Sequence, residues 1–262
     1  AAFAALAMTL AHGLFKATLF LSVGIIDHNT GTRDIRKLTG LGRAMPILAT
    51  TTGIAAASMA GVPLLFGFVA KEAVYEAALH LDTGWSLAAL IGILLGAALT
   101  MAYSLRFFFG AFGVKKKLPA LQCKAPTLIF LAPLLVLSAA TLFLGLYPQL
   151  VEPLAIHWSA AQGGPGKMHL LPFAGFNAAL GLSAVSVALG LCFFWLRHRT
   201  DTGAPLRRMV TSAEEIYRMS VNVLDKAAIW ITGRTQRGSL SFYLGVILVV
   251  VLVIPLAIAL TV

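Results

Sequence analysis

The stretch that decides the fold runs from Gly53 to Ala77 and reads GIAAASMAGVPLLFGFVAKEAVYEA. It has the apolar character of a membrane-spanning helix, but Pro63 lies near its middle, and Lys71 and Glu72 add two ionisable groups. Proline removes a backbone donor and clashes with the preceding turn, which predicts a break near Pro63. At membrane depth, freed backbone is tolerated only inside protein or beside water, and a charge usually belongs to an ion or proton pathway. The stretch therefore predicts a discontinuous transmembrane helix, as in many transporters.

The composition of the whole chain indicates an integral membrane protein. Apolar residues make up 59% of the 262 residues and charged residues only 11%, with a mean hydropathy of +0.88. A soluble domain carries about 25% charged residues. The net charge of +10 would suit nucleic acid, but the basic residues lie in alternate loops between apolar runs, which is the positive-inside pattern. We therefore expect the lipid bilayer as the surroundings of the chain and no nucleic acid among its partners.

Apolar runs of helix length predict transmembrane helices rather than the strands of a membrane barrel. The predicted spans are 1–26, 46–79, 85–112, 126–147, 172–196 and 240–262, with a loop at 147–171. The second span is too long for one straight crossing of about 20 residues, which again fits a discontinuous helix. The chain opens inside an apolar run without an initiator methionine or a signal peptide, so we expect an internal piece of a longer polypeptide.

A charged but periodic segment precedes the last span and predicts an amphipathic helix. Apolar residues such as Ile216 and Val223 fall on one side and charged residues such as Arg218 on another, while Ser212 and Glu215 have the spacing of a capping box. Such a helix lies along a membrane surface, where it either floats or braces its neighbours. The basic loops after the first, third and fifth spans place it on the cytoplasmic side.

The predicted fold is thus all-α, a polytopic transmembrane helix bundle with one discontinuous helix and a cytoplasmic-side amphipathic lateral helix. Its expected parts are later transmembrane helices (1–200), the surface helix (201–236) and an anchoring helix (237–262). The two cysteines, Cys123 and Cys192, have no metal-ligand companion at useful spacing, so we expect no disulfide, metal site or cofactor.

The candidate site residues are ionisable groups inside apolar runs. His12 and Lys16 lie one turn apart on one helix face, and histidine titrates near physiological pH. A lone histidine more often bonds a backbone carbonyl, and Lys71 could instead extend its ammonium to an interface. The shared face favours a water-linked proton relay from His12 and Lys16 to Lys71. Glu72 points about 100° away from Lys71, so it is either a counter-charge or a direct participant in transport.

Several stretches resemble a known family. AHGLFKATLF (11–20), IIDHNTGTRDIRKLTGL (25–41) and GVPLLFGFVAKE (61–72) together look like the antiporter-like subunits shared by Mrp-type multisubunit cation/proton antiporters and respiratory complex I. The 25–41 stretch is the most diagnostic, and with QRGSLSFYL (236–244) it resembles the A subunit of the Mrp antiporter. The resemblance covers the later part of the antiporter module.

This resemblance implies a proton-translocating subunit of a monovalent cation (Na⁺ or K⁺)/proton antiporter, without enzymatic activity. It implies other membrane subunits as partners, in a hetero-oligomeric complex of a bacterial cell membrane. The family's connecting-helix histidine and lysine correspond to His12 and Lys16, its second broken-helix lysine to Lys71, and Glu72 stands where relatives can be acidic. Two alternatives stay open: a proton-pumping antiporter-like subunit of respiratory complex I, and a scaffold with vestigial charges.

Overall fold

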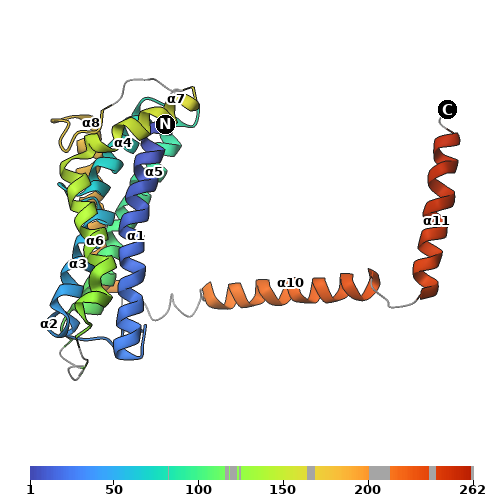
Figure 1. The fold of residues 1–262 in the computed structure, drawn as a ribbon, viewed down its shortest axis with the longest axis horizontal. Helices are drawn as coiled ribbons and strands as arrows, with labels where there is room; N and C mark the ends of the chain where they lie inside the picture. The colour runs from blue at the N-terminus through green and yellow to red at the C-terminus, as the bar shows by residue number, and fades with distance from the viewer. Residues whose placement is uncertain are drawn as a thin grey trace. The chain divides into compact units, whose positions relative to one another are not determined.

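The computed structural model describes residues 1–81, 83–115, 118, 123, 125–163, 169–200, 213–235 and 240–260. These residues form helices without strands and belong to two units, 1–200 and 201–262. The first unit contains α1 (Ala2–Thr30), α2 (Leu41–Ala44), α3 (Pro46–Ala60), α4 (Phe66–Leu79), α5 (Ser86–Phe112), α6 (Leu128–Leu146), the 3-10 helix η1 (Pro148–Leu150), α7 (Glu152–Ala161) and α8 (Ala178–Thr200). The second contains α10 (Ala213–Thr235) and α11 (Leu240–Ala259) (Figure 1).

Among the described residues, five helices are long and apolar enough to cross a membrane: α1, α5, α6, α8 and α11. They correspond to all the predicted spans except the broken one, and they confirm an all-α polytopic helix bundle. Two predicted ends were wrong. The first helix continues to Thr30 and ends where Gly31 takes a left-handed conformation. The fifth span starts later than 172, because the side chain of Asn177 accepts a hydrogen bond from the backbone N–H of Leu180 and caps α8 there.

The first unit is organised by α1, which packs against α3, α4, α6 and α7, while α5 packs against α3 and α8 (Figure 1). Apolar side chains fill these contacts, and small polar side chains join the helices between them. The Thr52 hydroxyl lies 2.8 Å from Ser22 Oγ and links α3 to α1. Ser138 of α6 donates to the carbonyl of Thr51 over 3.3 Å. Hydroxyl groups of this kind are a common means of helix association in membranes.

The prediction of a loop at 147–171 was wrong in part, because this segment contains η1 and the ten-residue helix α7. Prolines at the first helical positions favour both helices, since their fixed φ suits a first turn and their missing N–H is not needed there. The Glu152 carboxylate accepts a hydrogen bond of 2.7 Å from the backbone N–H of Leu170 and closes the connection that follows. Apolar runs dominated the sequence pattern, so this short half-exposed helix gave only a weak signal.

The loop after α1 is held by basic side chains. Asp27 pairs with Arg33, and hydrogen bonds from Arg36 hold the pKa of the Asp34 carboxyl at about 2. Lys115, from the loop after α5, donates hydrogen bonds to the carbonyl oxygens of Ile35, Leu38 and Gly110. Burial lowers the pKa of Lys115. This lysine therefore ties the loop after α5 to the loop after α1.

The second unit contains a helix, α10, within the segment for which a surface helix was predicted. The segment is helical over Ala213–Thr235, and its charged side chains include Arg234, whose guanidinium lies 4.5 Å from the ring centroid of Trp230. Residues 201–212, with Ser212 of the expected capping box, and 236–239 lie outside the described part of the chain. The position of α10 along a membrane surface, and the three-part domain division, stay predictions.

Candidate functional site

The predicted break lies between α3 and α4, at residues 61–65. The chain leaves α3 through Gly61, whose φ of +87° is left-handed. The N–H of Gly61 bonds the carbonyl of Ser58 at 3.1 Å, and the N–H of Val62 bonds that of Ala57 at 3.0 Å. This is a Schellman cap, in which glycine ends the helix because it has no side chain to oppose positive φ. Pro63 therefore prevents the helix from resuming, while Gly61 is the residue that ends it.

The two helix ends approach each other closely at Gly67. Its N–H donates a hydrogen bond of 3.1 Å to Ser58 Oγ. A Cβ atom at position 67 would lie only 2.0 Å from the Ser58 carbonyl oxygen, which no side chain can tolerate. Leu64, in the same linker, has a φ of +70°, a strained conformation for a residue other than glycine. The conformation of the break is therefore fixed by the close approach of Gly67 to Ser58 and by the backbone of Leu64.

Lys71 reaches back from α4 to the end of α3. Its Nζ donates a hydrogen bond of 3.0 Å to the carbonyl oxygen of Ala60, the last residue of α3, which the cap leaves available. The side chain crosses directly over Gly61, because a Cβ there would lie 3.0 Å from Lys71 Cδ and 3.2 Å from Nζ. The carbonyl end of a helix carries a partial negative charge that attracts a cation. The helix break thus provides a specific acceptor for the Lys71 ammonium.

Lys16 is connected to the same end of α3 by a second series of contacts, which runs through Tyr103. Its Nζ is 5.5 Å from the ring centroid of Tyr103 in α5, within the range of a cation–π interaction. The Tyr103 hydroxyl lies 3.5 Å from Met59 Sδ. Met59 precedes Ala60, whose carbonyl holds Lys71. Tyr103 was missed by the sequence analysis, although a tyrosine inside an otherwise apolar run was an available signal.

The other two candidate residues have different surroundings. His12 is exposed on α1, and its ring packs against Phe15 with centroids 5.2 Å apart. Glu72 is only 6% exposed, and its Oε1 has no hydrogen-bond partner among the described residues. The ion pairs within the described chain include neither Glu72 nor Lys71. The structure therefore places Lys71 on the carbonyl end of α3 and connects Lys16 to the neighbouring Met59 only through Tyr103, and it leaves His12 and Glu72 apart from these contacts.

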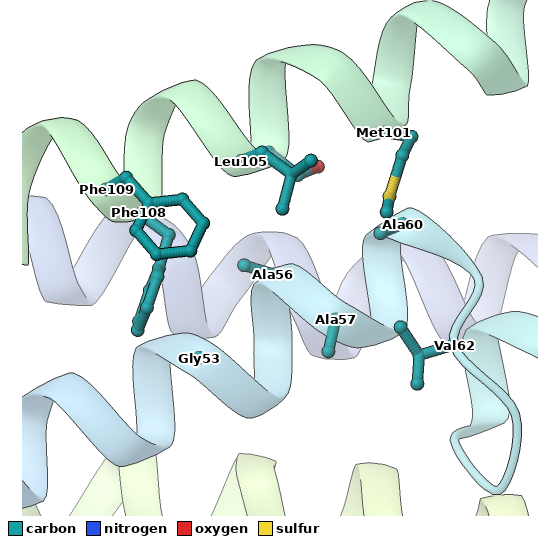
Figure 2. A pocket seen from close by; sticks show the side chains of 10 residues that line it. Gly53, Ala56, Ala57, Ala60, Val62, Met101, Leu105, Phe108 and Phe109 are labelled. Atoms are coloured by element: carbon teal, nitrogen blue, oxygen red, sulfur yellow. The ribbon is translucent and has the colours of Figure 1, made fainter. Parts of the chain in front are cut away.

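A pocket of about 180 Å³ lies between α3 and α5 beside this site. Figure 2 shows Met101 pointing toward Ala60 and Phe108 pointing toward Gly53, where small residues of α3 leave room. A Cβ at Gly53 would lie 3.2 Å from the Phe108 ring. The lining carries almost no polar surface, so the pocket offers an ion nothing to replace its hydration shell. The candidate site is therefore the helix break itself.

The comparisons with known proteins agree with this arrangement of helices. Residues 1–100 match the family described as "NADH:quinone oxidoreductase/Mrp antiporter, TM". The first 100 residues of the chain therefore resemble this family of antiporter-like membrane proteins. The solved structure of the Mrp complex from Dietzia sp. DQ12-45-1b contains a chain that is 32% identical, with a TM-score of 0.69 over 99% of this chain and 28% of that one. The family resemblance expected from residues 11–20, 25–41 and 61–72 is confirmed.

Curated relatives of this antiporter-like chain come from bacteria. The probable K⁺/H⁺ antiporter A/B subunit of Rhizobium meliloti is 36% identical over 89% of this chain and 24% of the relative. The Na⁺/H⁺ antiporter A1 subunit of Staphylococcus haemolyticus is 32% identical over 94% of this chain and 33% of the relative. The chain therefore spans a quarter to a third of these relatives. With the five apolar helices, they confirm a multi-pass protein of a bacterial cell membrane.

Proposed function

We propose that the chain is part of a proton-translocating subunit of a multisubunit monovalent cation/proton antiporter, a secondary transporter rather than an enzyme. The observation that carries the proposal is the hydrogen bond of 3.0 Å between Lys71 Nζ and the Ala60 carbonyl oxygen at a helix break. An ammonium at membrane depth is costly unless it faces protein or water, and it usually marks an ion or proton route. The names of the K⁺/H⁺ and Na⁺/H⁺ antiporter relatives support the same class of function.

In this proposal a proton moves between Lys16 and Lys71 around the end of α3. Tyr103 lies between them in the chain of contacts, with its ring against the Lys16 ammonium and its hydroxyl at Met59. A phenol can donate and accept a proton, so Tyr103 can order the water that carries the proton past α3. The tyrosine is a positioning residue in this route, and the two lysines are the proton carriers.

His12 and Glu72 have separate roles in the proposed route. His12 is the earlier relay member, one turn before Lys16 and on the exposed side of α1. Glu72 points about 100° away from Lys71 around α4 and serves as a second ionisable group of that helix. Protons and Na⁺ or K⁺ are the proposed transported ions, and other membrane subunits are the proposed partners. The similar Dietzia chain belongs to a complex, which supports partner subunits.

The matching family also covers NADH:quinone oxidoreductase subunits, so a proton-pumping role in respiratory complex I is the second candidate. The same lysines would carry protons in such a subunit. The two functions differ in what drives them. An antiporter dissipates a proton gradient when Na⁺ or K⁺ is added, whereas a redox pump builds one when quinone is reduced. The antiporter names of the curated relatives favour the first function.

The test is cation-driven dissipation of a pH gradient in vesicles that contain equal amounts of assembled complex. We expect Lys16→Ala to reduce exchange at least tenfold and Tyr103→Phe to reduce it less, because phenylalanine keeps the ring over Lys16 but loses the hydroxyl. Tyr147→Phe is the matched control, since this exposed tyrosine only packs its ring against Phe143. Full exchange in an assembled Lys16→Ala, His12→Ala double variant would remove both residues from the route.

A further inference from the structure

The helices α4 and α8 pack against each other, and together they carry three buried polar atoms without a hydrogen-bond partner among the described residues. They are Glu72 Oε1, the Tyr75 hydroxyl and Ser183 Oγ, on side chains that are 6%, 1% and 7% exposed. Among the described residues these are the buried side-chain atoms without a partner, and all of them belong to these two helices. Nearly all buried polar groups in proteins are paired, so each such atom needs an explanation, and a bound water or ion is one that three neighbouring oxygens suit.

Tyr75 of α4 and Ser186 of α8 come close together where these two helices pack. Glu72 and Tyr75 lie one turn apart on the same side of α4, and α8 packs against α4. The Tyr75 hydroxyl lies close to Ser186 without a hydrogen bond of standard geometry. Ser186 instead donates over 2.8 Å to the carbonyl of Ser183, one turn earlier on α8. The Tyr75 phenol and Ser186 therefore meet where the two helices pack, while Glu72 lies one turn from Tyr75 on α4 and Ser183 one turn from Ser186 on α8. We call these four residues, Glu72, Tyr75, Ser183 and Ser186, the α4–α8 site.

The charges around the α4–α8 site favour a cation. The stretches Pro46–Ala60, Leu128–Leu146 and Ala178–Leu196, which pack against α4, contain no Asp, Glu, Lys, Arg or His. On α4, the ammonium of Lys71 is bonded to the Ala60 carbonyl. The other ionisable neighbour of Glu72 on this helix is a second carboxylate, Glu76. The ionisable groups of the middle parts of α1 and α5 point elsewhere, since Lys16 lies on Tyr103, the His12 ring lies on Phe15, and Arg106 is exposed.

We propose that the α4–α8 site binds a partly dehydrated monovalent cation, with Glu72 as the charged ligand and the hydroxyls of Tyr75, Ser183 and Ser186 as neutral oxygen ligands. Oxygen atoms are the ligands that hard cations prefer, and one carboxylate matches one positive charge. The inference rests on the proposed antiport function. A cation enters as the Glu72 carboxylic acid loses its proton to water, leaving a carboxylate–cation pair, so one positive charge replaces another.

The test measures exchange and cation binding on the same assembled complex. In vesicles, Ser183→Ala should raise the apparent KM for Na⁺ about three- to tenfold while kcat changes less than twofold, because one neutral ligand is lost. Tyr75→Phe should act in the same direction. Glu72→Gln keeps the shape but loses the charge, so it should remove saturable binding of radioactive Na⁺ to the purified complex. In the wild type, that binding should weaken as the pH falls, since protons compete for Glu72.

Ser104→Ala is the matched control, because Ser104 is an equally buried serine of α5 that donates to its own helix at Thr100. Its Na⁺ KM should stay at the wild-type value. Unchanged Na⁺ KM and unchanged Na⁺ binding in Ser183→Ala and Glu72→Gln would overturn the cation site, and a fall in kcat alone would identify a water site instead. Absence of cation-driven proton flux in the wild type would refute the antiport function, whereas the binding measurement would still decide the α4–α8 site.

Discussion

Replacing Gly61 by alanine tests how the helix break holds Lys71. The new methyl group would lie 3.0 Å from Lys71 Cδ and 3.2 Å from Nζ, so the lysine side chain must move by a few tenths of an ångström, which weakens its hydrogen bond to the Ala60 carbonyl. The left-handed φ of +87° adds a backbone cost of about 1 kcal/mol. Loss of a hydrogen bond from a charged donor costs a further ~1.5–3 kcal/mol. Each 1.4 kcal/mol is a tenfold change in rate, so complete loss of the positioning hydrogen bond sets an upper bound of about ten- to hundredfold on the fall in exchange beyond the effect of backbone strain alone.

Gly31→Ala provides the matched control for this prediction. Gly31 also ends a helix with a left-handed φ, +70°, but its Cβ would have nothing within 4 Å. The two variants therefore share the backbone strain and differ in the displaced lysine. The assay is dissipation of a pH gradient on Na⁺ addition, normalised to assembled complex, with thermal unfolding measured alongside. Equal exchange in Gly61→Ala and Gly31→Ala at equal stability would refute the idea that the Ala60 carbonyl positions Lys71.

Gly67→Ala should prevent assembly of the complex altogether, because its Cβ would lie 2.0 Å from a backbone oxygen of α3; an intact complex on native gels would contradict the close approach of the two helices. Asp34 has its pKa lowered from 3.8 to about 2 by Arg36, so its contribution to stability is complete above pH 4 and is lost as the pH falls through 2. Asp34→Asn should therefore remove a stabilisation that is constant above pH 4, and small because Arg36 is exposed, so that the loss of stability between pH 4 and 2 becomes flatter; a steeper acid transition in that variant would be the opposite result. Ile216→Asp with Val223→Asp on α10 should weaken assembly in mild detergent if that helix braces its neighbours, and normal assembly and exchange would leave it a passive surface helix.

The sequence predicted the existence of the break, because Pro63 and the ionisable pair interrupt an apolar run. It did not identify Gly61 as the terminating residue, since a Schellman cap depends on hydrogen bonds between Val62, Ala57 and their neighbours that proline statistics do not contain. The partner of Lys71 was equally hidden. It is a backbone carbonyl, which has no signature in the sequence, and it becomes available only when α4 folds back against the end of α3.

The charged candidate residues could be found from the sequence, whereas the tyrosines of the site were missed. Rarity of charge in an apolar run was enough to single out Lys16, Lys71 and Glu72, and burial of Glu72 agrees with that reasoning. Tyr75 and Tyr103 gave a weaker signal than the charged residues, because tyrosine is common in membrane helices at interfaces. Their importance arises from tertiary contacts, with Tyr103 against Lys16 and Tyr75 beside Ser186. Helix existence was therefore predictable from local pattern, whereas the contacts of the site required the packing of helices distant in sequence.

The most direct test of the central claim, that Lys71 carries a proton at the helix break, compares Lys71→Arg with Lys71→Ala. Arginine keeps the positive charge and can still donate to the Ala60 carbonyl, but it does not release its proton in a protein. A proton carrier must exist in both protonation states during turnover. The measurement is cation-driven dissipation of a pH gradient in vesicles with equal amounts of assembled complex. The account predicts that the arginine variant is nearly as inactive as the alanine variant. Near-normal exchange in the arginine variant would contradict it and would make Lys71 a structural cation.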